Sequence, residues 1–266
     1  MNILVIGGAG YIGSHIVLEL LDTGGHQVTV FDNLSTGSLK NVPDGVGFIE
    51  GDILNDADLT KAFESDKFDV VFHFAALKAA GESMDEPGKY AHHNITGSIN
   101  ILNAMVKYDV KKIIFSSSAA VYGYPEYLPI DENHPTKPVN FYGFTKLEIE
   151  RILQWYSQLK GLRFAALRYF NAAGYDVKGR ITEMEKNCAN LLPIVMETAA
   201  GTREKVMVFG DDYNTVDGTG VRDYIHVNDL ATAHIKAMNY LNNENKDLIV
   251  NLGTGIGYSV LDVING

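Results

Sequence analysis

The sequence predicts an α/β fold, in which a doubly wound parallel sheet is followed by a smaller, mixed C-terminal lobe. Two observations favour this class. Over roughly the first 170 residues, short apolar runs alternate with longer amphipathic segments in a β-α-β-α rhythm. The rhythm then breaks at a polar, glycine-rich stretch. Because parallel strands are joined by right-handed crossovers, helices are expected on both faces of the sheet.

The expected elements of the first part follow from apolar spacing. The strands are short apolar runs at Asn2–Ile6, Gln27–Phe31, Val46–Glu50, Asp69–Ala75, Lys112–Ser116 and Arg163–Phe170. The helices carry apolar residues at helical spacing and include Tyr11–Thr23, Leu59–Phe63, Tyr90–Tyr108 and Phe141–Gln158. The polar residues that matter below follow apolar strand runs, so we expect them at the carboxyl edge of the sheet, where ligands bind in such folds.

Residues 171–266 are predicted to form the smaller lobe, with some segments returning to the sheet. The pattern indicates a helix at Ala189–Ala200, strands at Val206–Phe209, Tyr224–Val227 and Leu248–Leu252, and a helix from Asn228. Ser259 stands at a helix N-cap position before a last apolar run. The sequence ends soon after it, so we expect the chain to stop short of its last elements.

Composition excludes several classes of protein. The net charge of −11 disfavours extended nucleic-acid binding, because little would neutralise a run of phosphates. The single cysteine, Cys188, excludes an internal disulfide and is expected to be a packed residue rather than a catalytic thiol. No apolar window is long enough to span a membrane, and the N-terminus lacks the basic lead of a signal peptide. We expect a cytoplasmic protein.

The glycines after the first strand suggest a dinucleotide site. "GGAGYIGSH" places Gly8, Gly10 and Gly13 in a G-x-G-x-x-G pattern, and Gly7 gives a second reading of it. Between a strand and a helix, such glycines let backbone N–H groups approach a pyrophosphate; the alternative is a purely structural turn. Asp32 ends the second strand, where a carboxylate can bind both adenosine ribose hydroxyls and repel a 2′-phosphate. NAD is therefore favoured over NADP.

A second acid follows the third strand. Asp52 and Ile53 can bracket an adenine, with the carboxylate at the exocyclic amine and the isoleucine on the ring face. The alternative is a solvated loop acid. We expect residues 1–170 to form the NAD-binding domain, a Rossmann domain in the usual sense.

Ser118, Tyr142 and Lys146 are the predicted catalytic group. Ser118 lies at the end of the fifth strand, and Tyr142 and Lys146 share a helix face at i and i+4. A tyrosine has a pKa of about 10, but an ammonium and a positive nicotinamide ring both favour the phenolate. Tyr142 could then act as a general base, with Ser118 bonded to the same oxygen. Tyr-x-x-x-Lys also occurs as a chance surface pair; its order after the glycines, Asp32 and Ser118 makes chance a poor explanation.

The chain resembles the extended short-chain dehydrogenase/reductase family and, more narrowly, the UDP-glucose 4-epimerases within it. The resemblance rests on "GGAGYIGSH", "DNLSTG", "HFAALKAAGES", "FSSSAAVYG", "YGFTK", "LRYFNAAG" and "DGTGVRDYIHV", and it extends over essentially the whole chain. It implies NAD as cofactor, a UDP-hexose as substrate and no metal. The implied reaction interconverts UDP-glucose and UDP-galactose by oxidation at C4 to a 4-keto sugar, rotation, and re-reduction on the opposite face.

The resemblance also assigns residues by position. It implies cofactor contacts from Gly7, Gly10, Tyr11, Ile12, Gly13, Asp32, Asn33, Leu34, Ser35, Thr36, Gly37, Asp52, Ile53, Phe74, Ala75, Ala76, Leu77, Lys78, Asn94, Ser116, Tyr142, Lys146 and Phe170. It implies substrate contacts from Lys78, Ser118, Tyr142, Asn171, Asn190, Leu191 and Arg222. Arg222 makes independent sense as a forked cation for a diphosphate. The alternatives are a salt bridge with Asp217 or Asp223 for Arg222, and a solvated loop lysine for Lys78.

Other readings stay open at this point. A nucleotide-sugar 4,6-dehydratase is disfavoured, because Ala119 and Ala120 follow Ser118 where that reaction needs proton-moving residues. A UDP-N-acetylglucosamine 4-epimerase, a UDP-glucuronate decarboxylase and a catalytically weak NAD-binding protein are not excluded. Relatives pair through two helices, here Tyr90–Tyr108 and Phe141–Gln158, so the resemblance implies a homodimer.

Overall fold

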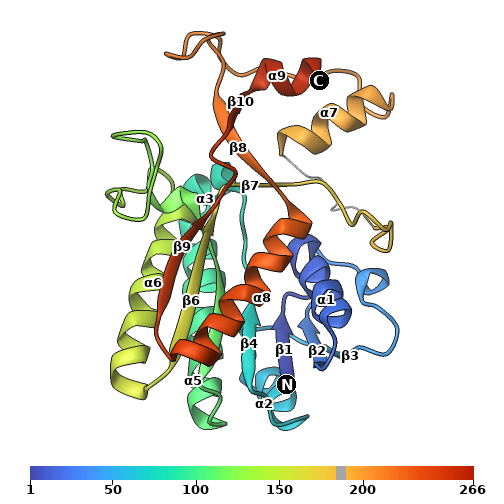
Figure 1. Cartoon of the computed structure of the whole chain (residues 1–266), viewed down its shortest axis with the longest axis vertical. Helices are drawn as coiled ribbons and strands as arrows, with labels where there is room; N and C mark the ends of the chain where they lie inside the picture. The colour runs from blue at the N-terminus through green and yellow to red at the C-terminus, as the bar shows by residue number, and fades with distance from the viewer. Residues whose placement is uncertain (184–189) are drawn as a thin grey trace.

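A parallel sheet with helices on both faces carries the predicted ligand edge (Figure 1). The computed structural model describes residues 1–183 and 190–266. In these residues the main sheet has seven strands. Across the sheet they are β3 (Gly47–Glu50), β2 (Gln27–Asp32), β1 (Asn2–Ile6), β4 (Val70–His73), β5 (Lys112–Ser118), β6 (Arg163–Tyr169) and β9 (Leu248–Leu252). All six neighbouring pairs are parallel, which confirms the predicted doubly wound sheet.

Two apolar cores lie on the two faces of this sheet. Helices α1 (Tyr11–Thr23) and α8 (Val227–Glu244) pack on one face, with Ile16, Leu20 and Leu241 fully buried. The other face carries α2 (Asp56–Glu64), α5 (Gly97–Lys107) and α6 (Phe141–Lys160). Strand order reverses at β1, which lies between β2 and β4. The carboxyl ends of β1 and β4 therefore form the switch point at which ligands bind in such sheets.

The C-terminal lobe covers the carboxyl end of the sheet (Figure 1). It contains a small second sheet of β7 (Asn171–Ala173), β8 (Val221–His226) and β10 (Gly257–Ser259). Two helices, α7 (Leu191–Ala199) and α9 (Val260–Asn265), lie beside it. Strand β9 returns to the main sheet beside β6, and α8 packs on α1, so the later residues share the first core.

The connecting helices are short. They are α3 (Ala80–Asp85), α4 (Pro87–Tyr90), the 3₁₀ turns η1 (Leu39–Asn41) and η3 (Ala119–Val121), and the π-helical segment η2 (Ala91–Thr96). The sequence predicts one helix over Tyr90–Tyr108, whereas η2 interrupts that span. Asn94 lies in η2, and its side chain bonds the backbone of Leu77 rather than facing solvent. Such π turns often mark functional positions.

Two predictions for the lobe differ from the structure. Val206–Phe209 is not a strand: among the described residues nothing pairs with it, and Phe209 is 84% exposed. A short apolar run becomes a strand only where a neighbour accepts its hydrogen bonds. The predicted helix Ala189–Ala200 begins in the structure at Leu191, and Ala189 and Cys188 lie outside the described residues. Ser259 does cap α9, in a capping box with Asp262.

Among the described residues, every helix is too short or too polar to cross a membrane.

Candidate active site

The glycine turn joins β1 to α1 at the switch point and leaves no room for side chains. A Cβ on Gly7 would lie 2.5 Å from the Ala75 backbone nitrogen, and φ there is +83°. A Cβ on Gly13 would lie 2.2 Å from the Gly7 carbonyl oxygen. Contacts this short exclude any larger residue, so the turn brings the start of α1 against both β1 and the loop after β4.

The N-terminus of α1 is available to an anion. Its N-cap is Gly10, which offers no side-chain hydrogen bond, and the first turn contains no acid. A Cβ on Gly10 would meet only the Gly7 oxygen, at 3.4 Å, so this side of the turn is open. The free N–H groups and the helix dipole favour a phosphate here. The donor set fits the pyrophosphate of a dinucleotide.

Asp32 ends β2 beside this turn. Its Oδ2 accepts the Ala9 N–H at 3.0 Å and its Oδ1 accepts the Leu34 N–H at 2.8 Å. Burial raises the pKa of Asp32, and the two N–H groups oppose that rise. Each oxygen keeps a lone pair for a hydroxyl group. The carboxylate is thus fixed where the sequence predicts the adenosine ribose.

The loop Asn33–Gly37 packs onto the turn. A Cβ on Gly37 would lie 2.8 Å from the Ala9 carbonyl carbon, and the Ser38 N–H donates to the Ala9 carbonyl at 3.1 Å. Asn33, Ser35 and Thr36 are exposed, so their side chains are accessible to a ligand. The predicted contacts of this loop therefore lie beside Asp32.

We expect Asp32→Ala to weaken NAD binding by tenfold or more, since a hydrogen bond to a charged group contributes about 1.5–3 kcal/mol. The measurement is NAD retained after gel filtration. The control is Asp44→Ala, which removes an exposed carboxylate. Equal retention by the Asp32 variant and the wild type would remove Asp32 from the ribose site.

Asp52 and Ile53 follow β3. Asp52 accepts the Asn33 side-chain amide at 3.0 Å and the Leu54 N–H at 2.8 Å, so it is bonded within the protein rather than simply solvated. A small hollow beside it is lined by Asn33, Glu50, Gly51, Asp52 and Asp58. Ile53 is only 7% exposed and packs against Gly97. Contact of both residues with adenine stays a prediction.

The loop Phe74–Lys78 is held in place by the buried side chain of Asn94. The Asn94 side chain accepts the Leu77 N–H at 2.9 Å and donates to the Leu77 carbonyl at 3.0 Å. It also donates to the Thr145 hydroxyl on α6 at 3.1 Å. These bonds fix the loop between the glycine turn and α6, and we expect Asn94 to act on a cofactor through them. Lys78 is exposed at the end of the loop.

Tyr142 meets Ser118 because a glycine follows it. Asn140 caps α6 by accepting the Gly143 N–H at 2.8 Å. A Cβ on Gly143 would lie 2.5 Å from the Ala120 carbonyl oxygen, so only glycine lets α6 approach η3 this closely. The Ser118 hydroxyl consequently lies near the Tyr142 hydroxyl and acts to lower its pKa. The Tyr142 N–H donates to the Ser83 hydroxyl at 3.0 Å, a contact that the sequence did not reveal.

Lys146 is buried beneath the tyrosine. Its ammonium donates to the Ser116 carbonyl at 2.6 Å and lies 5.8 Å from the centre of the Tyr142 ring. The Ser116 side chain bonds the Tyr169 hydroxyl. One group therefore forms where β5 ends and α6 begins, as the sequence predicts. It contains Ser116, Ser118, Tyr142 and Lys146.

The lowered pKa expected for Tyr142 with a cofactor bound stays a prediction. In the protein alone, burial raises the pKa of Tyr142 to about 12, although the Ser118 hydroxyl opposes the rise. Burial likewise lowers the pKa of Lys146 to about 7, opposed by Glu150. In the protein alone, Lys146 therefore does not bring the pKa of Tyr142 below its ordinary value. A lowered tyrosine pKa depends on a further positive charge, as a nicotinamide ring would provide.

Four of the predicted substrate residues, Asn171, Asn190, Leu191 and Arg222, lie in the lobe. The Asn171 side chain donates to the Asp223 carbonyl at 3.0 Å and so joins β7 to β8. Arg222 is exposed, and its guanidinium donates to the carbonyl of its own neighbour, Val221, at 2.8 Å. Asp217 and Asp223 are bonded instead to Thr219 and Thr254, so in the described part of the chain Arg222 forms no ion pair with either. The salt-bridge alternative is wrong.

The other lobe residues are less closely grouped. Asn190 is the exposed N-cap residue of α7 and Leu191 begins that helix. Phe170 donates its N–H to the Leu252 carbonyl at 3.3 Å, at the junction of the two sheets. Within residues 1–183 and 190–266, no hydrogen bond joins Asn190 or Leu191 to Arg222. Their common role stays a prediction.

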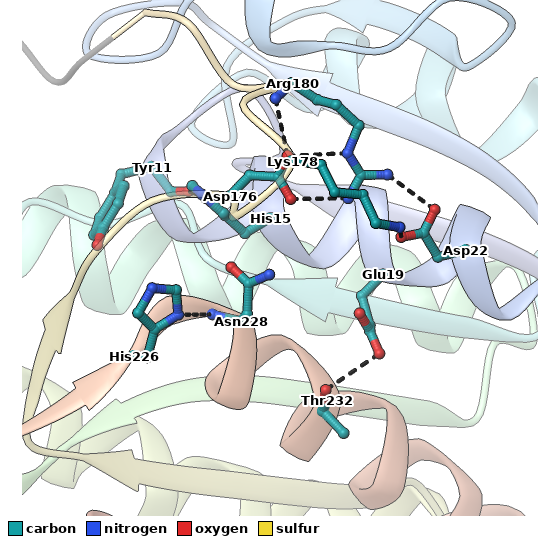
Figure 2. A network of polar contacts seen from close by, with 10 residues as sticks. All are labelled: Tyr11, His15, Glu19, Asp22, Asp176, Lys178, Arg180, His226, Asn228 and Thr232. Carbon is teal, nitrogen blue, oxygen red and sulfur yellow. Dashed lines mark hydrogen bonds and ion pairs between the residues drawn. The ribbon is translucent and has the colours of Figure 1, made fainter.

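Residues 174–180 form a polar segment, called the strap below, that contacts α1 from Tyr11 beside the glycine turn to Asp22 (Figure 2). Tyr11 donates its hydroxyl to the Gly174 carbonyl at 2.5 Å, which links the turn to the strap. Arg180 binds both oxygens of Asp176, at 3.0 and 2.9 Å, and also binds Asp22 on α1 at 2.9 Å. The sequence shows these residues only as a polar loop. Their pairing is a product of the tertiary structure.

We expect Asp176→Asn to lower Tm by a few degrees near pH 7. The Arg180 hydrogen bonds lower the pKa of Asp176 far below its ordinary 3.8. A lowered carboxyl pKa stabilises the fold above the unfolded value and loses that effect as the pH falls through the folded value. Thermal unfolding against pH should thus bring wild type and variant together at acid pH. A constant difference at every pH would contradict this.

The glycine turn, Asp32 and the Ser118–Tyr142–Lys146 group offer oxygen and nitrogen atoms that can form hydrogen bonds with a nucleotide. In the described part of the chain, no cluster of three or more histidine, cysteine or acidic side chains has the spacing of a metal site.

Together, the open glycine turn, the fixed Asp32 and the Ser118–Tyr142–Lys146 group define a class of protein: a dinucleotide-binding oxidoreductase fold of the short-chain dehydrogenase/reductase type. Residues 3–253 match the model of the NAD dependent epimerase/dehydratase family. The chain belongs to this family.

Individual relatives agree with this assignment. The chain is 50% identical over 264 residues to the UDP-glucose 4-epimerase of Halalkalibacterium halodurans, covering 99% of this chain and 78% of that protein. It is 45% identical to the crystal structure of the Brucella ovis UDP-glucose 4-epimerase in complex with NAD, with a TM-score of 0.95, covering 99% of this chain and 81% of that one. The Bifidobacterium longum enzyme, solved with NAD⁺ and UDP, is 42% identical with a TM-score of 0.94, covering 100% and 82%.

Proposed function

We propose that this protein interconverts UDP-glucose and UDP-galactose by reversible oxidation at C4 of the hexose, with NAD as its cofactor. The Ser118–Tyr142–Lys146 group at the carboxyl edge of the sheet carries the proposal. It joins a proton-transfer hydroxyl to a dinucleotide turn, and relatives of this chain at 42–50% identity are UDP-glucose 4-epimerases. Residues 1–170 would bind the cofactor and 171–266 the nucleotide sugar.

NAD fits the residues present. The N-terminus of α1 would hold its pyrophosphate, Asp32 its adenosine ribose and Lys146 its nicotinamide ribose. When bound, NAD supplies a hydride acceptor at the sugar C4 that can later act as the donor, together with a positive ring. The same interactions should keep the cofactor bound through many turnovers, because the proposed reaction consumes none.

Tyr142 moves the proton in this proposal. Its phenolate takes the proton of the C4 hydroxyl, and its phenol returns a proton to C4 oxygen from the same position. Ser118 lies near the Tyr142 oxygen and helps to hold the sugar hydroxyl in line. The Lys146 ammonium stabilises the phenolate from below the ring.

Arg222 is the proposed anchor for the UDP diphosphate. It is exposed, it forms no ion pair with an acid within residues 1–183 and 190–266, and its fork suits two phosphate oxygens. Asn171, Asn190 and Leu191 would complete the contacts to the nucleotide sugar. Strong binding to the nucleotide would leave the hexose free to present either face to the cofactor.

The test is incubation of the protein with UDP-galactose or UDP-glucose and analysis of the nucleotide sugars by NMR. We expect the same mixture from either side, with no net loss of NAD. Parallel incubations with UDP-N-acetylglucosamine and UDP-glucuronate test the two alternative activities, those of a UDP-N-acetylglucosamine 4-epimerase and of a UDP-glucuronate decarboxylase. Unchanged UDP-galactose in a protein that retains NAD would contradict the proposal and favour a catalytically weak NAD-binding protein.

A homodimer and a cytoplasmic location are proposed with the function. Helix α6 exposes Trp155 (60%) and Leu159 (69%), an apolar surface that a second copy would cover. The molar mass of the protein in solution, measured by light scattering, tests the dimer, and a monomer mass would count against it. The cytoplasmic location is supported by the single cysteine in the sequence.

A further inference from the structure

A buried ion pair lies directly under the proposed catalytic group. Glu150 follows Lys146 by one helical turn on α6 and is 1% exposed; Arg168 on β6 is 6% exposed. Arg168 donates to both carboxylate oxygens of Glu150, at 2.9 and 2.6 Å. The Ser117 hydroxyl donates to the same carboxylate at 2.5 Å. All three donors are directed at one carboxylate beneath the end of β5.

The pair is bonded to neighbouring strands on both sides. Arg168 also donates to the Tyr122 hydroxyl at 2.9 Å, and Tyr122 donates to Asn251 on β9 at 2.6 Å. The network thus connects α6, β5, β6 and β9. A buried ion pair adds little stability over an apolar pair of similar size, because both charges lose their water. The stability of the fold alone therefore gives no reason for charges at this place.

The position of Glu150 suggests a different use. Helix α6 is fixed to β5 at two consecutive serines: Lys146 donates to the Ser116 carbonyl at 2.6 Å, and Ser117 donates to Glu150. The next residue is Ser118, whose hydroxyl acts on the pKa of Tyr142. A movement of β5 relative to α6 would therefore misplace all three members of the proposed catalytic group.

Glu150 also supplies charge. The titratable groups around Lys146 are Tyr142 and Glu150 on α6, His73 at the end of β4, and Tyr169 on β6, which reaches it through Ser116. Burial lowers the pKa of His73 to about 3, and burial raises the pKa of Tyr169, so both are neutral at working pH. In this described set Glu150 is the group that carries a negative charge.

We propose that Glu150 is a positioning residue for the reaction: its carboxylate fixes the end of β5 against α6 and supports the positive charge of Lys146. The proposal rests on the proposed function for its effect on turnover. Its effect on Lys146 does not depend on that function. Glu150 touches neither substrate nor cofactor in this proposal and acts through Lys146, Ser117 and Ser118.

The test is the titration of Lys146 in the NAD-loaded protein, followed by NMR with carbon-13-labelled lysine and assigned with Lys146→Arg. Glu150→Gln removes the negative charge with little change in shape, so Lys146 should lose its proton at lower pH than in the wild type. We expect kcat to fall by about ten- to a hundredfold with KM changed less than about twofold, because the defect is one of geometry and charge at the reacting group.

A control separates this role from mere stability. Leu153→Ala creates a cavity at a fully buried position on the same helix and should lower Tm without moving the Lys146 titration. Glu150→Gln leaves Arg168 unpaired and can unfold the chain, so the double variant Glu150→Met with Arg168→Met serves as the second test. It should fold, and its Lys146 should again titrate at lower pH.

A folded double variant with the wild-type titration and kcat would overturn the proposal. A shifted titration in a protein that converts no nucleotide sugar would instead support the role of Glu150 and contradict the proposed function. The two failures are therefore distinguishable.

Discussion

Tyr142→Phe is expected to lower kcat by about 10²- to 10⁴-fold, the usual contribution of a positioned acid or base. The change removes one oxygen, the atom whose pKa Ser118 acts on and that would take the C4 hydroxyl proton. The ring remains above Lys146, so the fold and NAD binding should be preserved. The measurements are kcat with UDP-galactose and the NAD retained after gel filtration.

The matched control is Tyr124→Phe. Tyr124 is 79% exposed, and loss of its hydroxyl should leave kcat unchanged. If Tyr142→Phe kept the wild-type kcat, another group would have to move the proton, and the mechanism proposed for this site would be wrong.

Gly13→Ala is expected to abolish NAD retention and to lower Tm by about 2–12 °C. The added Cβ would lie 2.2 Å from the Gly7 carbonyl oxygen, so either the turn or α1 has to move. Overpacking of this kind costs about 1–3 kcal/mol, and each kcal/mol lowers Tm by about 2–4 °C in a chain of this size. The shift also moves the N–H groups that would hold the pyrophosphate. Thermal unfolding and cofactor content measure the two effects.

The chain offers a direct control in Gly88→Ala. Gly88 lies in α4 with open space around its Cβ position and no positive φ, so alanine there should be neutral or stabilising. Equal Tm and equal NAD content in both variants would show that the close approach at Gly13 is not required.

Much of the cofactor half could be predicted from the sequence because its signals are local. A strand, a glycine turn and a helix are adjacent in the chain, and so are β2 and Asp32. Parallel strands then bring their carboxyl ends to one edge by topology alone. Tyr142 and Lys146 share a face by helical spacing, and Ser118 follows from the end of β5. These predictions needed no knowledge of side-chain packing.

Other features depend on long-range contacts. Among the described residues, Val206–Phe209 has the composition of a strand but no partner, and η2 contains Asn94, which bonds a loop seventeen residues earlier. The direction of the Tyr142 pKa depends on burial, which local sequence does not fix. Glu150 did have a signal, since it continues the Tyr142–Lys146 face by one turn, but only β6 supplies its Arg168 partner.

The stretch Asn140–Lys146 shows both kinds of feature, those that follow from local sequence and those that depend on long-range contacts. Its letters by themselves determined a helix and a tyrosine four residues before a lysine on one face. Only the tertiary structure decided that Gly143 packs on the Ala120 carbonyl, that Ser118 therefore meets Tyr142, and that burial raises the tyrosine pKa while lowering that of the lysine. Periodicity is a property of neighbouring residues, whereas desolvation and close approach are set by segments distant in the chain.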